Sequence, residues 1–346
     1  MVKRTPKAPS LPAAPIHPDP ENAWREASRS KPLETLKEFK PGIYFNIPFS
    51  DYGMIPAINR SSLSLAKSSL LHYRYRPHAD ESPALAFGSL CHHNKLEPEV
   101  FKERYVVLPD FHLEEGNVTQ KGTRTESKNT TYYKNRVAEF MALHPGKQEV
   151  SREWIEAMEG VVKALDHHPI AGPLFKNGYP EVTLVWEDPK TSLLCKARID
   201  WLAIEGKTLP LNRDPKSRKD YKLLYNYISS LLDIKTSQDC TRFYLDEYDY
   251  HLQAAFYLEG LYVLCDADKP RPFHFAAVEK SYPHACRCAP ASSEALHHGN
   301  AEAEFLLYQI QQAKLAKRYP GPKDPEHWTV SPWYKEHYRD LLPTWA

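Results

Sequence analysis

The sequence lacks a strong net charge, because 45 Lys and Arg residues stand against 44 Asp and Glu residues and give +1 at pH 7. No global field would therefore attract nucleic acid, and a DNA-binding surface would have to be a local basic patch. An apolar run of membrane-spanning length and a signal peptide are also missing. We therefore expect a cytoplasmic protein without a membrane partner.

Paired cysteine motifs are missing as well. The six cysteines are scattered without a CxxC pair. The one close pair is a CxC, Cys286 and Cys288, which is a weak indication of a metal site. The pattern favours reduced thiols in an intracellular protein.

The 346 residues, 42% of them hydrophobic, suffice for a sizeable core in one large domain or two ordinary ones. Residues 1–42 are rich in proline and charge and lack periodicity, so we expect a disordered segment. The remainder, 43–346, is expected to be a single domain with an insert at about 205–230. Residues 111–130 are polar enough to predict a long mobile loop, and the aromatic-rich tail is expected to pack on the body.

Hydrophobic periodicity predicts an α/β fold with a mixed central sheet flanked by helices. A first helix is predicted from the caps at 59–62 to Pro77, and a second from Pro83 to about Leu96. Further helices are predicted at 131–144, 151–167, 246–264 and 292–317. The predicted core strands are 181–186, 194–202, 231–236 and 274–279.

Asp200 and the later run Asp233-Ile234-Lys235 are the most informative residues, since each piece lies in a strand-like stretch. Side chains alternate along a strand, so Asp233 and Lys235 share a face while Ile234 points into the core. Two carboxylates can hold a divalent cation, and an adjacent ammonium can orient or activate water. This is the minimal equipment for metal-assisted phosphodiester hydrolysis.

Four further residues strengthen this interpretation. His92 lies on the predicted helix 83–96, Glu181 opens the first core strand, and Gln253 and Tyr257 are four apart on one helical face. Each also has a plainer explanation. His92 could be a structural histidine, Glu181 a surface charge, and Gln253 and Tyr257 ordinary packing residues.

The order His, Glu, Asp, DxK, QxxxY is the layout of the PD-(D/E)XK nucleases of the RecB type. Several stretches resemble the nuclease domain of exonuclease VIII (RecE) and its phage relatives. The resemblance covers roughly residues 43–318, and its motifs are specific in combination. The matching stretches are 87–92 (FGSLCH) with 96–98 (LEP), 195–201 (CKARIDW), 233–236 (DIKT), 250–257 (YHLQAAFY) and 278–280 (VEK).

The resemblance implies a PD-(D/E)XK core and a Mg²⁺ site in which Mn²⁺ can substitute. Mg²⁺ prefers hard oxygen ligands. Asp200, Asp233 and the Ile234 carbonyl would supply them, with His92 as a further ligand or an anchor behind the ligands.

The same resemblance assigns catalytic roles. Lys235 would orient the attacking water and stabilise the charge of the transition state. Glu181 would help to hold a second ion or a water. Gln253 and Tyr257 would position DNA or Lys235.

The implied activity is 5′→3′ digestion of linear duplex DNA from its ends, in phage-type recombination or repair. A ring-shaped homo-oligomer and a single-strand annealing partner are implied with it. Three alternatives stay open: a structure-specific or restriction-type endonuclease on the same fold, a non-catalytic DNA-binding protein, and a recombination scaffold that acts through its partner.

The insert departs from the family, since it separates Asp200 from Asp233 by 233 − 200 = 33 positions. The entropic cost of a longer loop grows only logarithmically, so the two strands should still pair. From 205 to 230 there are six basic and three acidic residues with interleaved tyrosines. These could contact phosphates and stack on bases, or the insert could be a solvated hairpin extension.

Overall fold

The computed structural model describes residues 40–76, 82–206, 217–267 and 269–324. The expected disorder of the N-terminal segment and the expected packing of the aromatic tail fall almost wholly outside this range. Within it, no helix is both long and apolar enough to cross a membrane.

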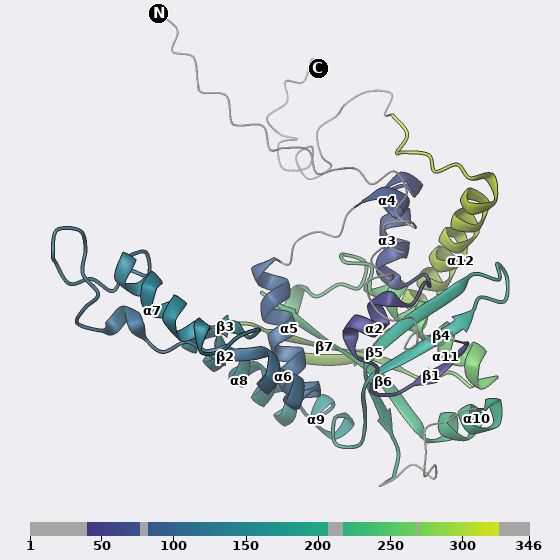
Figure 1. Ribbon diagram of the computed structural model, residues 1–346. Coiled ribbons are helices and arrows are strands. Elements are labelled where there is room, and N and C mark those ends of the chain that lie inside the picture. The colour runs from purple at the N-terminus through teal and green to yellow at the C-terminus, as the bar shows by residue number, and fades with distance from the viewer. Residues whose placement is uncertain (1–39, 77–81, 207–216, 268, 325–346) are drawn as a thin grey trace, which may run out of the picture.

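A mixed six-stranded sheet forms the centre, in the order β1-β4-β5-β6-β7-β8 (Figure 1). Within this sheet, only β6 and β7 run parallel, and the other neighbours are antiparallel. This confirms the predicted fold class. The strands are β1 (Gly42–Tyr44), β4 (Gly178–Glu187), β5 (Leu194–Ile204), β6 (Ile228–Ser237), β7 (Phe273–Glu279) and β8 (Cys286–Pro290). A small parallel pair joins β2 (Tyr105–Val107) and β3 (Gln148–Val150).

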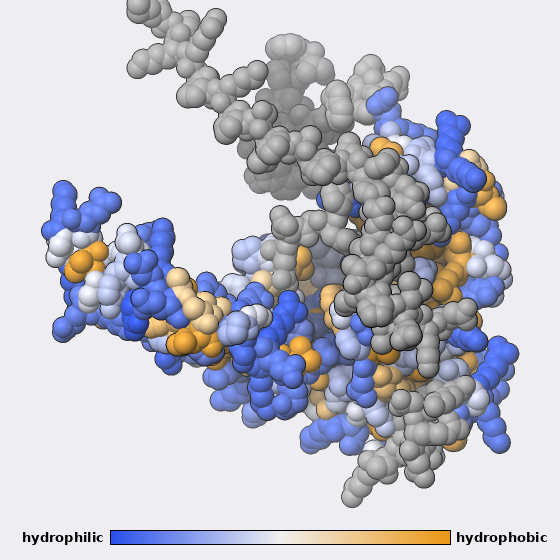
Figure 2. All heavy atoms as spheres, viewed as in Figure 1, coloured by the Kyte–Doolittle hydropathy of each residue, from blue (hydrophilic) through white to orange (hydrophobic). Residues whose placement is uncertain are grey.

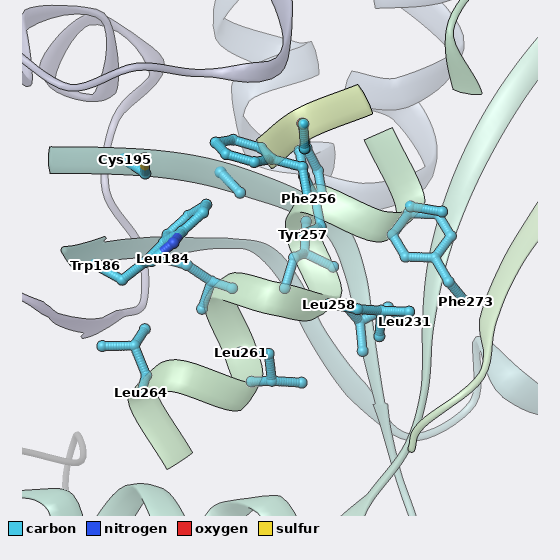
Figure 3. Packing of buried hydrophobic residues seen from close by; sticks show 14 of the residues in the cluster. Leu184, Trp186, Cys195, Leu231, Phe256, Tyr257, Leu258, Leu261, Leu264 and Phe273 are labelled. Atoms are coloured by element: carbon cyan, nitrogen blue, oxygen red, sulfur yellow. The ribbon is translucent and has the colours of Figure 1, made fainter. Parts of the chain in front are cut away.

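Helices cover both faces of the sheet (Figure 1). On one face α11 (Tyr250–Cys265) lies between the sheet and α12 (Ser293–Ala316), so it is buried nearly all round. Its cluster includes Trp186, Phe256 and Phe273 (Figure 3). On the other face α5 (Pro83–Leu96) and α8 (Arg152–His167) enclose a second core. The remaining helices are α2 (Phe49–Met54), α3 (Arg60–Ser68), α4 (Leu70–Tyr75), α6 (Pro98–Arg104), α7 (Thr131–Ala142), α9 (Ala171–Leu174), α10 (Arg218–Tyr227), and the 3₁₀ turns η2 (Phe111–Leu113) and η3 (Cys240–Arg242).

Two helix predictions need correction. The helix expected from 59–62 to Pro77 is broken at Ser69, whose extended backbone ends α3 and whose hydroxyl accepts from His72 N–H to begin α4. The helix expected from 246 begins only at Tyr250, because Asp249 adopts a left-handed conformation at φ 56°. Both breaks depend on a single residue's backbone, which periodicity does not reveal.

The stretch expected to be a mobile loop, 111–130, has internal structure. Asn117 is fully buried, and its amide donates to the carbonyls of His112, Thr125 and Ser127. One buried side chain thus links the backbone at three places in this polar stretch. The loop and α7 form an arm that extends from the body, and its surface is mostly hydrophilic (Figures 1 and 2).

The insert is slightly shorter than predicted. Strand β5 continues to Ile204 and β6 begins at Ile228, so the insert spans 205–227, of which 207–216 lie outside the described residues. The rest contains α10, which opens with a capping box at Ser217 and buries Leu224 and Tyr225 against the core. The described part of the insert after residue 216 is therefore a helix packed on the core and not a solvated hairpin.

Helix α12 approaches α11 closely at Gly299. A Cβ there would lie 2.2 Å from the carbonyl oxygen of His251 and 2.8 Å from Ala255 Cβ. We expect Gly299→Ala to lower the free energy of unfolding by about 1–3 kcal/mol, as overpacking does. Denaturant unfolding measures this loss. Gly53→Ala is the matched control, since nothing lies within 4 Å of that position, and an unchanged midpoint for Gly299→Ala would contradict the close packing.

Candidate active site

The site lies where two central strands separate. The pairing of β5 with β6 ends at Trp201 and Leu232, so the strands part at the next residues, Asp200 and Asp233. Beyond this point the N–H of Ile234 donates to Asp200 Oδ2 at 2.9 Å instead of to a neighbouring strand. The split therefore brings the Asp200 carboxylate to the backbone of the DxK strand.

A backbone irregularity places Glu181 beside Asp200. Glu181 adopts φ 52°, a left-handed conformation that costs free energy for a residue with a side chain. The pairs on either side of it are in register, so Glu181 lies opposite Asp200 across β4 and β5. On a regular strand, Tyr179 and Val182 would point to opposite faces, because they are three positions apart. Both contact the same core, so the alternation of side chains is interrupted between them. The left-handed backbone at Glu181, inside β4, thus brings the carboxylates of Glu181 and Asp200 together.

His92 reaches the split from α5. Its Nε2 lies 2.9 Å from the carbonyl oxygen of Ile234, and its Nδ1 lies 3.5 Å from Asp200 Oδ2. A carbonyl can only accept, so Nε2 carries the proton in this hydrogen bond. A neutral ring then leaves the Nδ1 lone pair directed at Asp200. A backbone carbonyl that fixes the other ring nitrogen is the usual support of a metal-ligating histidine.

The groups present fit a divalent cation. His92, Glu181 and Asp200 offer ligand atoms that all lie within 4.8 Å of one another. Burial raises the pKa of Glu181 to about 7, and the charge of Asp200 adds to it. Burial, together with the charge of Asp233, raises the pKa of Asp200 well above its usual range. A cation would relieve this repulsion between crowded carboxylates.

Asp233 lies on the α11 side of the split and is 2% exposed. Its Oδ1 accepts from the amide of Gln253. Its Oδ2 lies 2.5 Å from Lys235 Nζ, so the ammonium forms an ion pair with this buried atom. A carboxylate oxygen has more than one lone pair, so this ion pair still leaves Oδ2 able to bind a cation.

Lys235 is held between a carboxylate and an aromatic ring. Burial by itself lowers the pKa of Lys235, but the charges of Asp233 and Asp200 outweigh it and the pKa is raised. Its Nζ also lies 4.8 Å from the ring centroid of Tyr250, within cation–π range. The ammonium is therefore kept charged beside the carboxylates.

The structure thus brings together His92, Glu181, Asp200, Asp233, Lys235 and Gln253. Tyr257 is 9% exposed and packs edge-on against Phe273 in the core, yet it lies near enough to the site for the charges of Asp233 and Asp200 to add to the rise that burial causes in its pKa. The Ile234 carbonyl is engaged by His92 and retains a second lone pair. The individual roles given to these residues stay predictions.

Sequence reasoning gave Tyr250 no role in the site, and it left the partner of Arg198 open between a carboxylate and a DNA phosphate. Tyr250 precedes Gln253 by three positions, and this helical spacing was a usable signal. Arg198 Nε donates to Glu181, and Arg198 is 7% exposed. An ion pair between strands has no comparable signature in the sequence.

A comparison with known protein families assigns the chain to a family. Residues 66–324 match the family described as "PDDEXK-like domain of unknown function (DUF3799)", about three quarters of the chain. The chain therefore belongs to this family, and so to the PD-(D/E)XK nuclease superfamily. No curated protein matches it. Among solved structures, a protein from Eubacterium rectale described as a "Putative exonuclease" matches at 14% identity and TM-score 0.43, over 84% of this chain and 96% of that one.

Proposed function

We propose that this protein is a Mg²⁺-dependent deoxyribonuclease that digests linear duplex DNA from its ends, with 5′→3′ polarity. The observation that carries the nuclease assignment is the convergence of His92, Glu181 and Asp200 with the DxK pair at the split of β5 and β6. The exonuclease activity and its polarity are carried over from the resemblance of the motifs to exonuclease VIII. The same resemblance supports an oligomeric ring and a single-strand annealing partner in recombination or repair.

The residues divide the chemistry between them. A divalent ion held by Asp200, Asp233, Glu181 and His92 would act as a Lewis acid on the scissile phosphate. Lys235 has its ammonium at the mouth of the split, 19% exposed, where it can orient the attacking water and stabilise developing negative charge.

Two further groups, the Gln253 amide and the Ile234 carbonyl, hold the proposed metal ligands in position. Gln253 fixes the orientation of the Asp233 carboxylate through its amide hydrogen bond. The Ile234 carbonyl fixes the tautomer of His92 in the same way. Because these groups are already oriented, little free energy is spent on reorganising them during the reaction. This is the basis of electrostatic preorganisation.

The experiment that separates this function from its main rival compares two topologies of one plasmid. With Mg²⁺, we expect steady loss of the linearised duplex while the covalently closed circle persists. Nicking or linearisation of the closed circle would identify an endonuclease instead. Binding of both without cleavage would identify a non-catalytic DNA-binding protein.

The basic residues of helix α10 could contact DNA, but the helix lies away from the active site along the chain. Arg218 and Lys219 are exposed, but α10 precedes β6, whose residues reach the site only at Asp233. We expect Arg218→Gln with Lys219→Gln to leave DNA affinity and its salt dependence unchanged. Each phosphate contact adds roughly −0.9 to the slope of log K against log salt. A slope flattened by about 1.8 in fluorescence anisotropy titrations would instead place DNA on α10.

A further inference from the structure

A short segment before the family match is fastened to the strand that carries Asp200. Lys196 Nζ donates to the carbonyls of Tyr52 and Ile55 at 2.8 Å each. The guanidinium of Arg198 donates to the carbonyl of Ile47 at 2.7 Å. Lys196 and Arg198 are only 5% and 7% exposed. Two buried cations of β5 therefore fix the backbone around α2 in place.

This fastening holds an exposed aromatic ring close to the active site. Phe49, the first residue of α2, is 68% exposed. Its ring centroid lies 5.6 Å from Arg198 Cζ, and the ring stacks on Tyr52 at 6.3 Å and 29°. The same guanidinium donates to Glu181. A single side chain thus connects the Phe49 ring to the cluster of His92, Glu181 and Asp200.

We propose that Phe49 stacks on a nucleobase of the DNA strand held in the active site. The inference rests on the proposed function, because it takes the substrate to be DNA. A lone exposed phenylalanine is common on protein surfaces. This ring differs in that Arg198 and Tyr52 already support it, so little conformational entropy is lost when a base covers the exposed surface. Stacking tolerates any sequence, because every base has a π-face.

The position also favours a base over other ligands. A phosphate at the carboxylate cluster brings its own nucleotide to the neighbourhood of Glu181. The base of that nucleotide or of the next one needs an apolar surface once it leaves the DNA stack. Phe49 is an exposed aromatic ring that contacts the same guanidinium, Arg198, that donates to Glu181.

A double-mutant cycle between the ring and the base tests the proposal. The probe is a fluorescent duplex with an unpaired end, in which a single abasic nucleotide is moved along that end. Dissociation constants are measured by anisotropy for the wild type and for Phe49→Ala with Mg²⁺, on a probe whose phosphorothioate linkages resist cleavage, so that a cation offsets the carboxylate charge at the phosphate. We expect Phe49→Ala to weaken binding of the intact probe roughly 10-fold. At one position, the abasic probe should weaken wild-type binding similarly and add nothing to Phe49→Ala.

Two variants serve as controls. Phe49→Trp keeps an aromatic face and should bind the intact probe at least as tightly as the wild type does. Phe305→Ala removes another exposed ring, 58% exposed on α12, and should leave binding unchanged. Equal affinity of Phe49→Ala and the wild type, independent losses at every abasic position, or a wild type that does not bind the probe would overturn the proposal. Wild-type cleavage with Mg²⁺ is scored separately, so failure of the nuclease assignment is distinguishable from failure of the stacking contact.

Discussion

Replacing Lys235 with alanine is expected to lower the rate of DNA cleavage by on the order of 10²-fold or more, which is the usual cost of losing one electrostatic stabiliser of a transition state. The ammonium lies 2.5 Å from Asp233 Oδ2 and against the Tyr250 ring. These two contacts hold its charge beside the carboxylates of the site. Single-turnover digestion of linear duplex with Mg²⁺ measures the loss.

The binding of DNA and the fold should survive this change. Removal of Lys235 leaves no apolar cavity in either core, and a divalent cation held by Asp233 would compensate the charge that the ammonium no longer neutralises. Lys222→Ala is the matched control, since it removes a cation from the surface of α10 and should cleave normally. Near-normal cleavage by Lys235→Ala would refute the role assigned to this residue.

Replacing either Asp200 or Asp233 with asparagine is expected to abolish Mg²⁺-dependent cleavage, and EDTA should silence the wild type. Asparagine keeps the size of the side chain but loses the charge that a hard divalent cation requires. Asn at position 200 can still accept the hydrogen bond from Ile234 N–H that Asp200 Oδ2 accepts. The loss would therefore reflect the missing charge and not a collapsed strand.

A stability measurement separates metal binding from catalysis. The raised pKa of Asp200 means that burial and its neighbours oppose the charged form in the metal-free fold. Asp200→Asn should then be at least as stable as the wild type in EDTA. Mg²⁺ or Mn²⁺ should raise the wild-type melting temperature, as any ligand of the native state does, and should leave the variant unchanged. Equal metal-induced shifts in both proteins would place the cation elsewhere.

The elements and the central residues could be predicted because their signals are local. The apolar runs predicted the main strands, and Pro83 predicted the start of α5. The DxK spacing predicted a common face for Asp233 and Lys235. The motif resemblance placed His92 and Asp200 in one site, and both lie there.

The missed features depend on contacts between distant segments or on a single backbone torsion. The left-handed backbone at Glu181 and the end of the β5–β6 pairing together bring the carboxylates of Glu181, Asp200 and Asp233 to one place. Asn117 orders a stretch whose polarity alone predicts mobility. Alternation along the strand predicts Lys196 and Arg198 on the face of Asp200, where one could pair with a carboxylate or a DNA phosphate. It does not reveal that a segment about 150 positions earlier in the chain buries both.

The most direct test of the central claim is a time course of linear duplex DNA, labelled at either its 5′ or its 3′ ends and incubated with Mg²⁺ or with EDTA. We predict early release of the 5′ label with Mg²⁺, later loss of the 3′ label, and no release in EDTA. Release of the 3′ label first would reverse the proposed polarity. Intact DNA with Mg²⁺, or equal digestion in EDTA, would contradict the assignment of a metal-dependent nuclease.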